Sequence, residues 1–411
     1  MRAWRSTELT WKPAVARIDV LPQHPAAPVT AKSGSILKFP LFALLLLSAI
    51  ARADAPPVPP PPSIAATAWI LTDQASGRVI AAQGAGQAVE PASLTKLMTA
   101  YAVFHALQDG KLKLDMLVPI SERAWRAEGS RTFLDLGTRV PVEVLLQGMI
   151  VQSGNDASIA LAEAVAGTEQ TFAALMNQYA KRLDMTGSHF ENATGLPSAN
   201  HRVTVSDMAK LARALIREFP DYYRWYSQRD FSWNGITQAN RNGLLARDPS
   251  VDGVKTGMTD NAGYCLVSSA RRDGMRLIAV VMGTKSTTAR EDASLALLNY
   301  GFSFFESRRL QAAHEEMTRL RVYKANGGVA AVGIAEDLYA TLPRGQAERI
   351  ELRLELAPNV FAPLSAMDRV GVVRALLDGK VVAEAALQPI DDVPLGGFFR
   401  RLWDTIVSWF S

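Results

Sequence analysis

The apolar residues of this 411-residue chain change their spacing along the sequence, and each spacing predicts a kind of element. Residues 69–73 and 78–82 are rich in strand-forming side chains and flank a polar stretch at 74–77, which predicts a β-hairpin. Pro91 then suits the first turn of a helix. The residues that follow it at helical spacing, and that predict one buried helix face, are Leu94, Leu97, Met98, Tyr101, Ala102 and Phe104.

A helical pattern returns at Pro141, breaks at residues 153–155 and resumes through residues 159–162. Residues 204–207, with the sequence Thr-Val-Ser-Asp, fit a capping box at the start of a further helix. The apolar residues of that helix are Met208, Leu211, Leu215 and Ile216.

Two strand-like runs, at residues 263–270 and 276–282, precede a last helical run at 294–300. Strands therefore come first, a helical block follows, and strands return. This order predicts that residues 64–309 form one α+β domain around an antiparallel sheet.

From residue 310 onward the pattern alternates with period two, and no helical period competes with it. The alternation is clearest in residues 319–323, 351–356, 369–373 and 380–383. We therefore expect residues 310–392 to form a small all-β sandwich domain.

Apolar residues return at spacings of three and four in the last segment, residues 393–411. They are Leu395, Phe398, Phe399, Leu402, Trp403, Ile406, Trp409 and Phe410. A packed core helix would show the same pattern. The terminal position, the aromatic residues and the adjacent Arg400 and Arg401 favour an amphipathic helix that lies in a membrane interface. With three charges and too few apolar residues, the segment is not expected to span a bilayer.

At the other end, Lys38 precedes a short apolar run, residues 41–50, and the small-residue pattern Ala51-Arg52-Ala53. This is the pattern of a secretory signal. We expect residues 1–53 to be a signal peptide with a long leader, so that the protein is exported. Residues 54–63 are proline-rich and predict a stiff linker.

The composition, with 48% apolar and 20% charged residues, is that of a globular protein. The net charge of +4 is small and the basic residues are scattered, so nothing indicates nucleic-acid binding. Cys265 lies in an apolar run and is expected to be a buried, unreactive side chain. The five histidines lack the spacing of zinc ligands. We therefore expect no metal and no cofactor.

The candidate chemistry begins with Ser93 and Lys96, which lie three residues apart and would share one face of a helix. A desolvated lysine can act as the base that activates a serine nucleophile, and the free N–H groups of a first helical turn can help to hold an oxyanion. By itself the S-x-x-K pattern is weak, since a second copy, Ser35 to Lys38, lies inside the expected leader.

Two further triplets strengthen the case. Ser153-Gly154-Asn155 and Lys255-Thr256-Gly257 follow in the order S-x-x-K, S-x-N, K-T-G, which is the set of penicillin-binding proteins and serine β-lactamases. With residues 92–99, 152–157, 240–245 and 251–257, the chain closely resembles the low-molecular-mass penicillin-binding proteins, the serine-type D-alanyl-D-alanine carboxypeptidases. This resemblance implies a penicillin-recognising catalytic domain, an appended β-sandwich and a C-terminal membrane anchor.

The resemblance also implies a role for each matched residue. Ser93 would form an acyl-enzyme with the penultimate D-alanine, and Lys96 would be its general base. Ser153 would relay a proton to the leaving D-alanine, while Asn155 would hold Lys96 and the substrate amide. Lys255 would supply positive field from a strand edge along which the backbone of Thr256 and Gly257 aligns the peptide.

Arg241 and Arg290 match family positions at which a guanidinium could bind the terminal carboxylate of the substrate. The alternative for each is an ordinary surface arginine, and it weighs more for Arg290 than for Arg241. Met258 departs from the family, which often has histidine or threonine after K-T-G, and so bears on the turnover rate.

The expected partners are stem peptides ending in D-Ala-D-Ala, β-lactam antibiotics, and the outer surface of the cytoplasmic membrane through the C-terminal helix. The expected location is the periplasmic side of the inner membrane. Two alternatives remain open from the sequence: a serine β-lactamase, which the additional β domain and anchor disfavour, and a non-hydrolytic peptidoglycan-binding protein, which the intact Ser93 and Lys96 disfavour.

Overall fold

The computed structural model describes residues 14–17 and 58–407. By their internal contacts these residues form two compact units, which are described separately. The larger unit contains Pro59–Arg308 and Thr341–Pro343. The β-rich unit contains residues 309–340 and 344–407, together with residues 14–17.

The larger unit is built on an antiparallel five-stranded sheet with the strand order β3-β2-β10-β9-β8. Its strands are β2 Ala68–Asp73, β3 Val79–Gln83, β8 Val251–Thr259, β9 Gly263–Arg272 and β10 Met275–Thr284. The larger unit also contains two short hairpins. They are β4 Leu117–Pro119 with β5 Arg139–Pro141, and β6 Asp230–Trp233 with β7 Ile236–Ala239.

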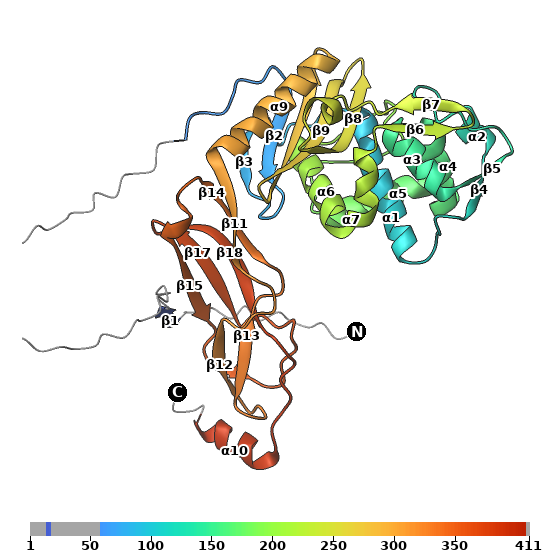
Figure 1. Ribbon diagram of the computed structural model, residues 1–411. Coiled ribbons are helices and arrows are strands. Elements are labelled where there is room, and N and C mark those ends of the chain that lie inside the picture. Colours follow the sequence, from blue (N-terminus) through green and yellow to red (C-terminus); the bar gives the residue numbers. More distant parts are fainter. Residues whose placement is uncertain (1–13, 18–57, 408–411) are drawn as a thin grey trace, which may run out of the picture. The chain divides into compact units, whose positions relative to one another are not determined.

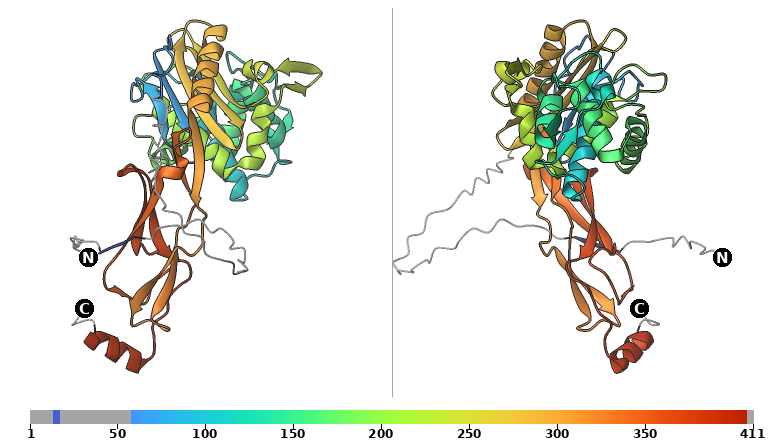
Figure 2. Two further views of the ribbon diagram at one scale, coloured as in Figure 1. Left: turned by 60° about the vertical axis from the view of Figure 1, so that its left-hand side comes forward. Right: turned by 90° about the vertical axis from the view of Figure 1, so that its right-hand side faces the viewer.

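The helices of the larger unit occupy both faces of this sheet (Figures 1 and 2). They are the 3₁₀ helices η1 Ala92–Thr95 and η2 Arg224–Ser227, and the α-helices α1 Lys96–Gln108, α2 Glu122–Trp125, α3 Val142–Val151, α4 Asn155–Ala166, α5 Glu169–Arg182, α6 Val205–Glu218, α7 Pro220–Tyr223, α8 Leu244–Arg247 and α9 Thr287–Phe304.

Successive side chains of a strand point to opposite faces of the sheet, and in β10 both sets are buried by helices. On β10, Ile278 and Val280 belong to the large core shared with the helical block. Leu277, the residue before Ile278, points the other way: a Cβ added at Gly301 of α9 would lie 2.5 Å from its side chain. Both faces are thus buried, and β2 is buried along its whole length. The predicted α+β fold with an antiparallel sheet is confirmed.

Two local predictions differ in detail from the structure. The last helix of this unit is longer than its apolar pattern, since α9 begins at Thr287 and not near residue 294. The Thr204 side chain caps α6 by accepting a hydrogen bond from Asp207 N at 3.1 Å. The Asp207 carboxylate does not complete the capping box, because it accepts from Gly187 N and the Ser188 hydroxyl instead.

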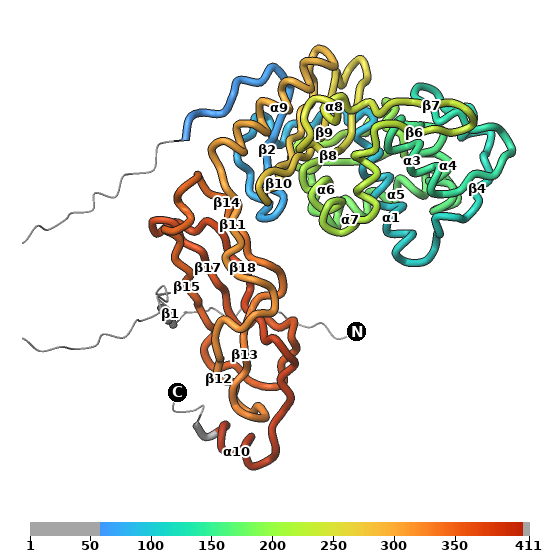
Figure 3. Tube along the Cα trace, in the orientation of Figure 1, coloured from blue at the N-terminus to red at the C-terminus, as the bar shows by residue number. Residues whose placement is uncertain are grey.

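The strands of the β-rich unit form a ladder in the order β1-β15-β17-β18-β13-β12-β16, while β11 pairs with β14. Figure 3 labels β15, β17, β18, β13 and β12 of this ladder. The elements are β1 Ala14–Arg17, β11 Phe305–Gln311, β12 Thr318–Tyr323, β13 Val329–Gly333, β14 Leu338–Pro343, η3 Ala347–Arg349, β15 Ile350–Leu356, β16 Val360–Phe361, β17 Gly371–Leu377, β18 Lys380–Pro389 and α10 Phe398–Val407.

β18 changes partners along its length, from β17 to β13. Leu320 of β12 and Val332 of β13 therefore share one core with Leu354 of β15 and Val373 of β17. This arrangement agrees with the β-rich domain that the alternating pattern predicts. Among the described residues, no helix is long and apolar enough to cross a membrane.

Candidate active site

Ser93 and Lys96 meet at the junction of η1 and α1. Residues three apart in a 3₁₀ turn lie one above the other, which places the two side chains together. Lys96 Nζ donates to Ser93 Oγ at 2.9 Å, to Asn155 Oδ1 at 2.7 Å and to the Thr194 carbonyl at 2.6 Å. Ser93 thus has a lysine amine within reach of its proton.

Lys96 is 1% exposed, and its surroundings favour the neutral amine. The pKa of Lys96 is lowered from its usual 10.5 to about 7, first by burial and then by the positive charge of Arg241, while Asp156 acts in the opposite direction. In a substantial fraction of the molecules, the Lys96 amine is therefore unprotonated near neutral pH, as a general base requires.

The S-x-N triplet lies between α3 and α4. Ser153 adopts a positive φ of 66°, which is uncommon for a residue other than glycine. Its hydroxyl is buried and has no hydrogen-bond partner within the described part of the chain. Both polar side-chain atoms of Asn155 are hydrogen-bonded, since its Oδ1 accepts from Lys96 and its Nδ2 donates to the Glu128 carbonyl at 2.5 Å. Ser153 is thus available to a ligand, whereas Asn155 orients Lys96.

The K-T-G triplet lies on β8, the edge strand of the sheet. A Cβ added at Gly257 would lie 3.2 Å from Ser93 N, so glycine lets the strand approach the nucleophile closely. Lys255 is buried, and its Nζ donates to the Thr256 carbonyl at 3.2 Å. Burial, followed by the charges of Lys96, Arg241 and Arg290, lowers the pKa of Lys255 well below its usual value.

The two candidate arginines lie at different depths. Arg241 is exposed, and its Nε donates to the Gln152 side chain at 2.7 Å. Arg290 is buried and extends from α9 over the ring of Tyr264. Its terminal nitrogens make long contacts of 3.4 Å to the carbonyls of Gly257 and Arg241, and its Nε has no partner among the described residues. Both guanidinium groups retain donors for an anionic ligand.

These groups surround one cavity of about 650 Å³. Lys96 and Lys255 are buried and contact the lining residues Ser93 and Thr256, respectively. The lining residues are Ser93, Gly129, Ser130, Ser153, Asn155, Thr194, Gly195, Leu196, Arg241, Thr256, Gly257, Met258, Thr259, Tyr264, Thr287 and Arg290. In such a cavity a serine hydroxyl, activated by the buried lysine, can attack an acyl group. The arginines in the wall can bind a carboxylate next to that acyl group.

Sequence reasoning missed two contributors to this site. Thr194 supplies a backbone carbonyl to Lys96, and the buried Asp156 accepts hydrogen bonds from the backbone of Thr132 and Leu134. Asp156 thereby holds the segment next to Ser130 against the start of α4. A backbone contact leaves no signal in the residue type, although the Asn192-x-x-Gly195 pattern indicates a turn near Thr194.

Comparison with known proteins agrees with this geometry. Residues 54–286 match the family described as D-alanyl-D-alanine carboxypeptidase, and residues 305–395 match the penicillin-binding protein 5 C-terminal domain. The D-alanyl-D-alanine carboxypeptidase DacC of Escherichia coli (strain K12) is 41% identical over 366 residues, which cover 85% of this chain and 92% of that protein.

Solved structures show the same relationship. Penicillin-binding protein 5 from Haemophilus influenzae has a TM-score of 0.77 at 41% identity, covering 82% of this chain and 99% of its own. Penicillin-binding protein D2 from Listeria monocytogenes, in its ampicillin-bound form, has a TM-score of 0.55 at 28% identity and covers 59% of this chain and all of its own. The chain therefore belongs to the D-alanyl-D-alanine carboxypeptidase family, serine-type penicillin-binding proteins that act on peptidoglycan.

Proposed function

We propose that this chain removes the terminal D-alanine from peptidoglycan stem pentapeptides through an acyl-enzyme on Ser93. The observation that carries the proposal is the contact between Ser93 Oγ and a buried Lys96 whose pKa is about 7. Lys96 takes the hydroxyl proton as Oγ bonds to the penultimate D-alanine carbonyl carbon. The N–H of Ser93 itself, in the first turn, helps to hold the resulting oxyanion.

The tetrahedral adduct collapses when the bond to the terminal D-alanine breaks. The leaving amine needs a proton, and the unpartnered Ser153 hydroxyl can pass one to it from Lys96. Water then attacks the ester carbonyl with Lys96 as base, and Ser93 recovers its proton. Every proton stays within the set of Ser93, Lys96, Ser153, substrate and water, so the cycle needs no cofactor.

Recognition of the substrate's free carboxylate falls to the cationic wall of the cavity. Arg241 and Arg290 both line it, and Lys255 lies behind Thr256 and Gly257. We assign the carboxylate to Arg241 and Arg290, because a planar guanidinium can bind it with two parallel hydrogen bonds. The exposed Met258 at the rim offers a thioether where relatives often have a polar group.

Replacement of Arg241 tests the carboxylate assignment. We expect Arg241→Ala to lower D-alanine release from a pentapeptide ending in D-Ala-D-Ala by about 10- to 100-fold, the loss typical of a charge-assisted hydrogen bond. The same peptide with an amidated C-terminus should lose clearly less, since it has no carboxylate to bind and is slowed only by the rise in the Lys96 pKa that follows loss of the Arg241 charge. Equal losses on both peptides would show that Arg241 does not bind the carboxylate.

β-Lactams are proposed as covalent inhibitors of the same site. The Listeria monocytogenes relative has been solved in an ampicillin-bound form. A β-lactam presents a strained amide next to a carboxylate, so Ser93 opens it as it opens the peptide. The ester that forms should then deacylate slowly.

We further propose that α10 places the protein on the membrane. On a surface helix the apolar side chains usually face the protein core. In α10 the aspartate faces inward and the apolar side chains face outward. Asp404 is 2% exposed and accepts hydrogen bonds from Lys324 N at 2.6 Å and from Arg400 Nε at 3.2 Å. The outward residues are Phe398 at 70%, Phe399 at 83%, Leu402 at 53% and Trp403 at 64% exposure.

This outward apolar face, together with Arg400 and Arg401, fits an anionic lipid surface. Ile406 of the predicted face lies at the end of α10, and Trp409 and Phe410 lie outside the described residues. The proposed location is the periplasmic face of the inner membrane, following export by the leader, residues 1–53. β1 lies within that leader, so the sheet of the mature chain would begin at β15. The proposed domain segments remain 54–63, 64–309, 310–392 and 393–411.

Removal of α10 tests the membrane proposal. A mature chain ending at Gly397 keeps the backbone bonds of Pro394 and Gly396 to the β-rich unit. We expect it to stay in the supernatant with anionic phospholipid vesicles at low salt, while the full mature chain sediments with them. Serine at Phe398, Phe399, Leu402 and Trp403 should likewise prevent sedimentation. Both altered chains should keep wild-type activity on soluble peptides, and sedimentation of either would contradict the proposal.

A further inference from the structure

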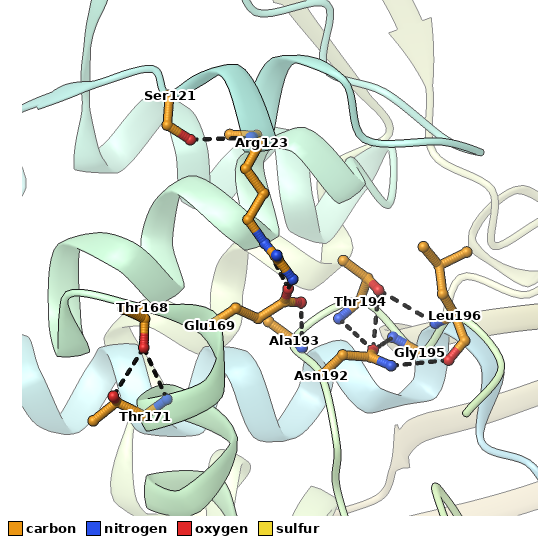
Figure 4. Close-up of polar contacts among 11 residues, drawn as sticks. Ser121, Arg123, Thr168, Glu169, Thr171, Asn192, Ala193, Thr194, Gly195 and Leu196 are labelled. Carbon is orange, nitrogen blue, oxygen red and sulfur yellow. Dashed lines mark hydrogen bonds and ion pairs between the residues drawn. The ribbon is translucent and has the colours of Figure 1, made fainter. Parts of the chain in front are cut away.

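A short turn, residues 192–196, is held by its own first residue, Asn192, as Figure 4 shows. The turn contacts Lys96 through the Thr194 carbonyl. Asn192 Oδ1 accepts hydrogen bonds from Thr194 N at 3.1 Å, the Thr194 hydroxyl at 3.0 Å and Gly195 N at 2.7 Å. Asn192 Nδ2 donates to the Leu196 carbonyl at 2.9 Å. The turn is therefore rigid within itself, and its position depends on what holds it from outside.

On one side the turn packs against η1 and the start of α1. Gly195 has a φ of 86°, and a Cβ there would lie 1.8 Å from the Ala92 carbonyl oxygen, so only glycine fits. The Ala193 carbonyl accepts from the Thr99 hydroxyl at 2.7 Å. The Thr194 carbonyl accepts from Lys96 Nζ at 2.6 Å. A shift of this turn would therefore move an acceptor of the general base.

On the other side the turn is held by a buried carboxylate. Glu169, the first residue of α5, is 6% exposed, and its Oε1 accepts a hydrogen bond from Ala193 N at 3.1 Å. Its Oε2 accepts from Arg123 Nε at 3.1 Å and from a second Arg123 nitrogen, as Figure 4 shows. The Arg123 side chain is 66% exposed. Glu169 is thus the inner member of an ion pair whose outer member reaches solvent.

Both members of the pair sit on capped helix starts, which fixes their positions. Thr168 caps α5 by accepting a hydrogen bond from Thr171 N at 3.1 Å. Ser121 caps α2 by accepting from Ala124 N at 3.1 Å. Helix caps of this kind hold the first turn in place. Glu169 can therefore transmit the position of α5 to the turn.

We propose that Glu169 is a positioning residue for the reaction: through its bond to Ala193 N it holds the Thr194 carbonyl against Lys96 Nζ. The inference rests on the proposed role of Lys96 as general base. Loss of the Glu169 acceptor leaves Ala193 N without a partner, so the turn can shift. A shift of about 1 Å at a reacting group commonly costs on the order of 10- to 100-fold in rate.

The test measures the second-order rate of acylation by a fluorescent penicillin across pH. In Glu169→Ala we expect the high-pH plateau to fall at least about tenfold. The midpoint of the acid limb should also move below that of the wild type, because the protonated Lys96 loses one of its three hydrogen-bond acceptors. Arg241, Asp156 and Lys255 face Lys96 in both proteins and are unchanged.

Variants at Arg123 distinguish a positioning role of Glu169 from a role that depends only on its ion pair with Arg123. Arg123→Ala keeps the Glu169 oxygen for Ala193 N and should acylate within about threefold of wild type. In Glu169→Gln the amide has one oxygen for two donors, Arg123 and Ala193 N, so an intermediate loss is expected. The double variant Arg123→Ala with Glu169→Gln frees that oxygen for Ala193 N and should acylate faster than Glu169→Gln alone.

Glu355→Ala is the matched control, because Glu355 is a carboxylate of similar burial, 9% exposed, that is paired with Arg374 at 2.6 Å in the β-rich unit. It should lower the thermal midpoint without changing the acylation profile. A wild-type plateau in Glu169→Ala, a reduced plateau with the wild-type midpoint, or a double variant no faster than Glu169→Gln would each overturn the proposal. Wild-type protein that fails to acylate would instead overturn the proposed function.

Discussion

Ser93→Ala should abolish covalent labelling by a fluorescent penicillin, with acylation at least about 10⁴-fold slower than wild type. The β-lactam ring is opened by the hydroxyl that attacks the peptide, and no second hydroxyl is placed to replace it. Ser130 and Ser153, the other serines that line the cavity, make no hydrogen bond to Lys96 within the described part of the chain. Gel fluorescence after incubation with excess penicillin measures the effect.

The fold should survive this change. Lys96 retains Asn155 Oδ1 and the Thr194 carbonyl as acceptors, so its amine is not left unpaired. The thermal midpoint should therefore stay within a few degrees of wild type, roughly the range expected for losing one hydrogen bond. Persistent labelling of a Ser93→Ala protein with an unchanged thermal midpoint would move the nucleophile to another residue.

Lys96→Arg should be almost as damaging, with acylation slower by about 10³- to 10⁴-fold. The substitution keeps a positive charge and a hydrogen-bond donor near Ser93 but removes the ability to accept a proton, because a guanidinium does not deprotonate in proteins. Stopped-flow acylation at saturating penicillin separates this loss from weaker binding.

Lys96 is buried, so the larger guanidinium brings a risk of altered packing. Lys96→Gln serves as the second variant, because it is smaller and equally unable to act as a base with the required pKa. Near-ultraviolet circular dichroism reports whether each variant retains native packing. Acylation of either folded variant within about tenfold of wild type would contradict the base assignment.

Much of the fold could be predicted from the spacing of apolar residues, because burial of one face of a helix or strand requires apolar residues at the period of that element. β2, β9 and β10 coincide with the apolar runs, and α3 and α4 are separated at Ser153 as the pattern predicts. The pattern fails at the start of α9, where Arg290 and Glu291 are buried polar residues. Glu291 is paired there with Arg247, so that turn is buried without being apolar.

In the candidate site, too, some features could be predicted from the residue pattern and others could not. The three triplets identify residues whose side chains carry the proposed chemistry, and the structure brings Ser93, Lys96, Ser153 and the backbone of β8 around one cavity. Contacts made through backbone groups could not be predicted. The Thr194 carbonyl and the Ala193 N–H act on Lys96 and Glu169 regardless of their own side chains.

The pH dependence of acylation in the wild-type protein tests the central claim most directly, because it reads the protonation state of Lys96. The second-order rate reports the free enzyme. Protonated Lys96 cannot take the serine proton, so the rate should be low at acid pH, rise with a midpoint near the Lys96 pKa of about 7, and level off above it. A rate that does not change between about pH 5 and pH 9, or a rise centred near the ordinary lysine pKa of 10.5, would contradict the account.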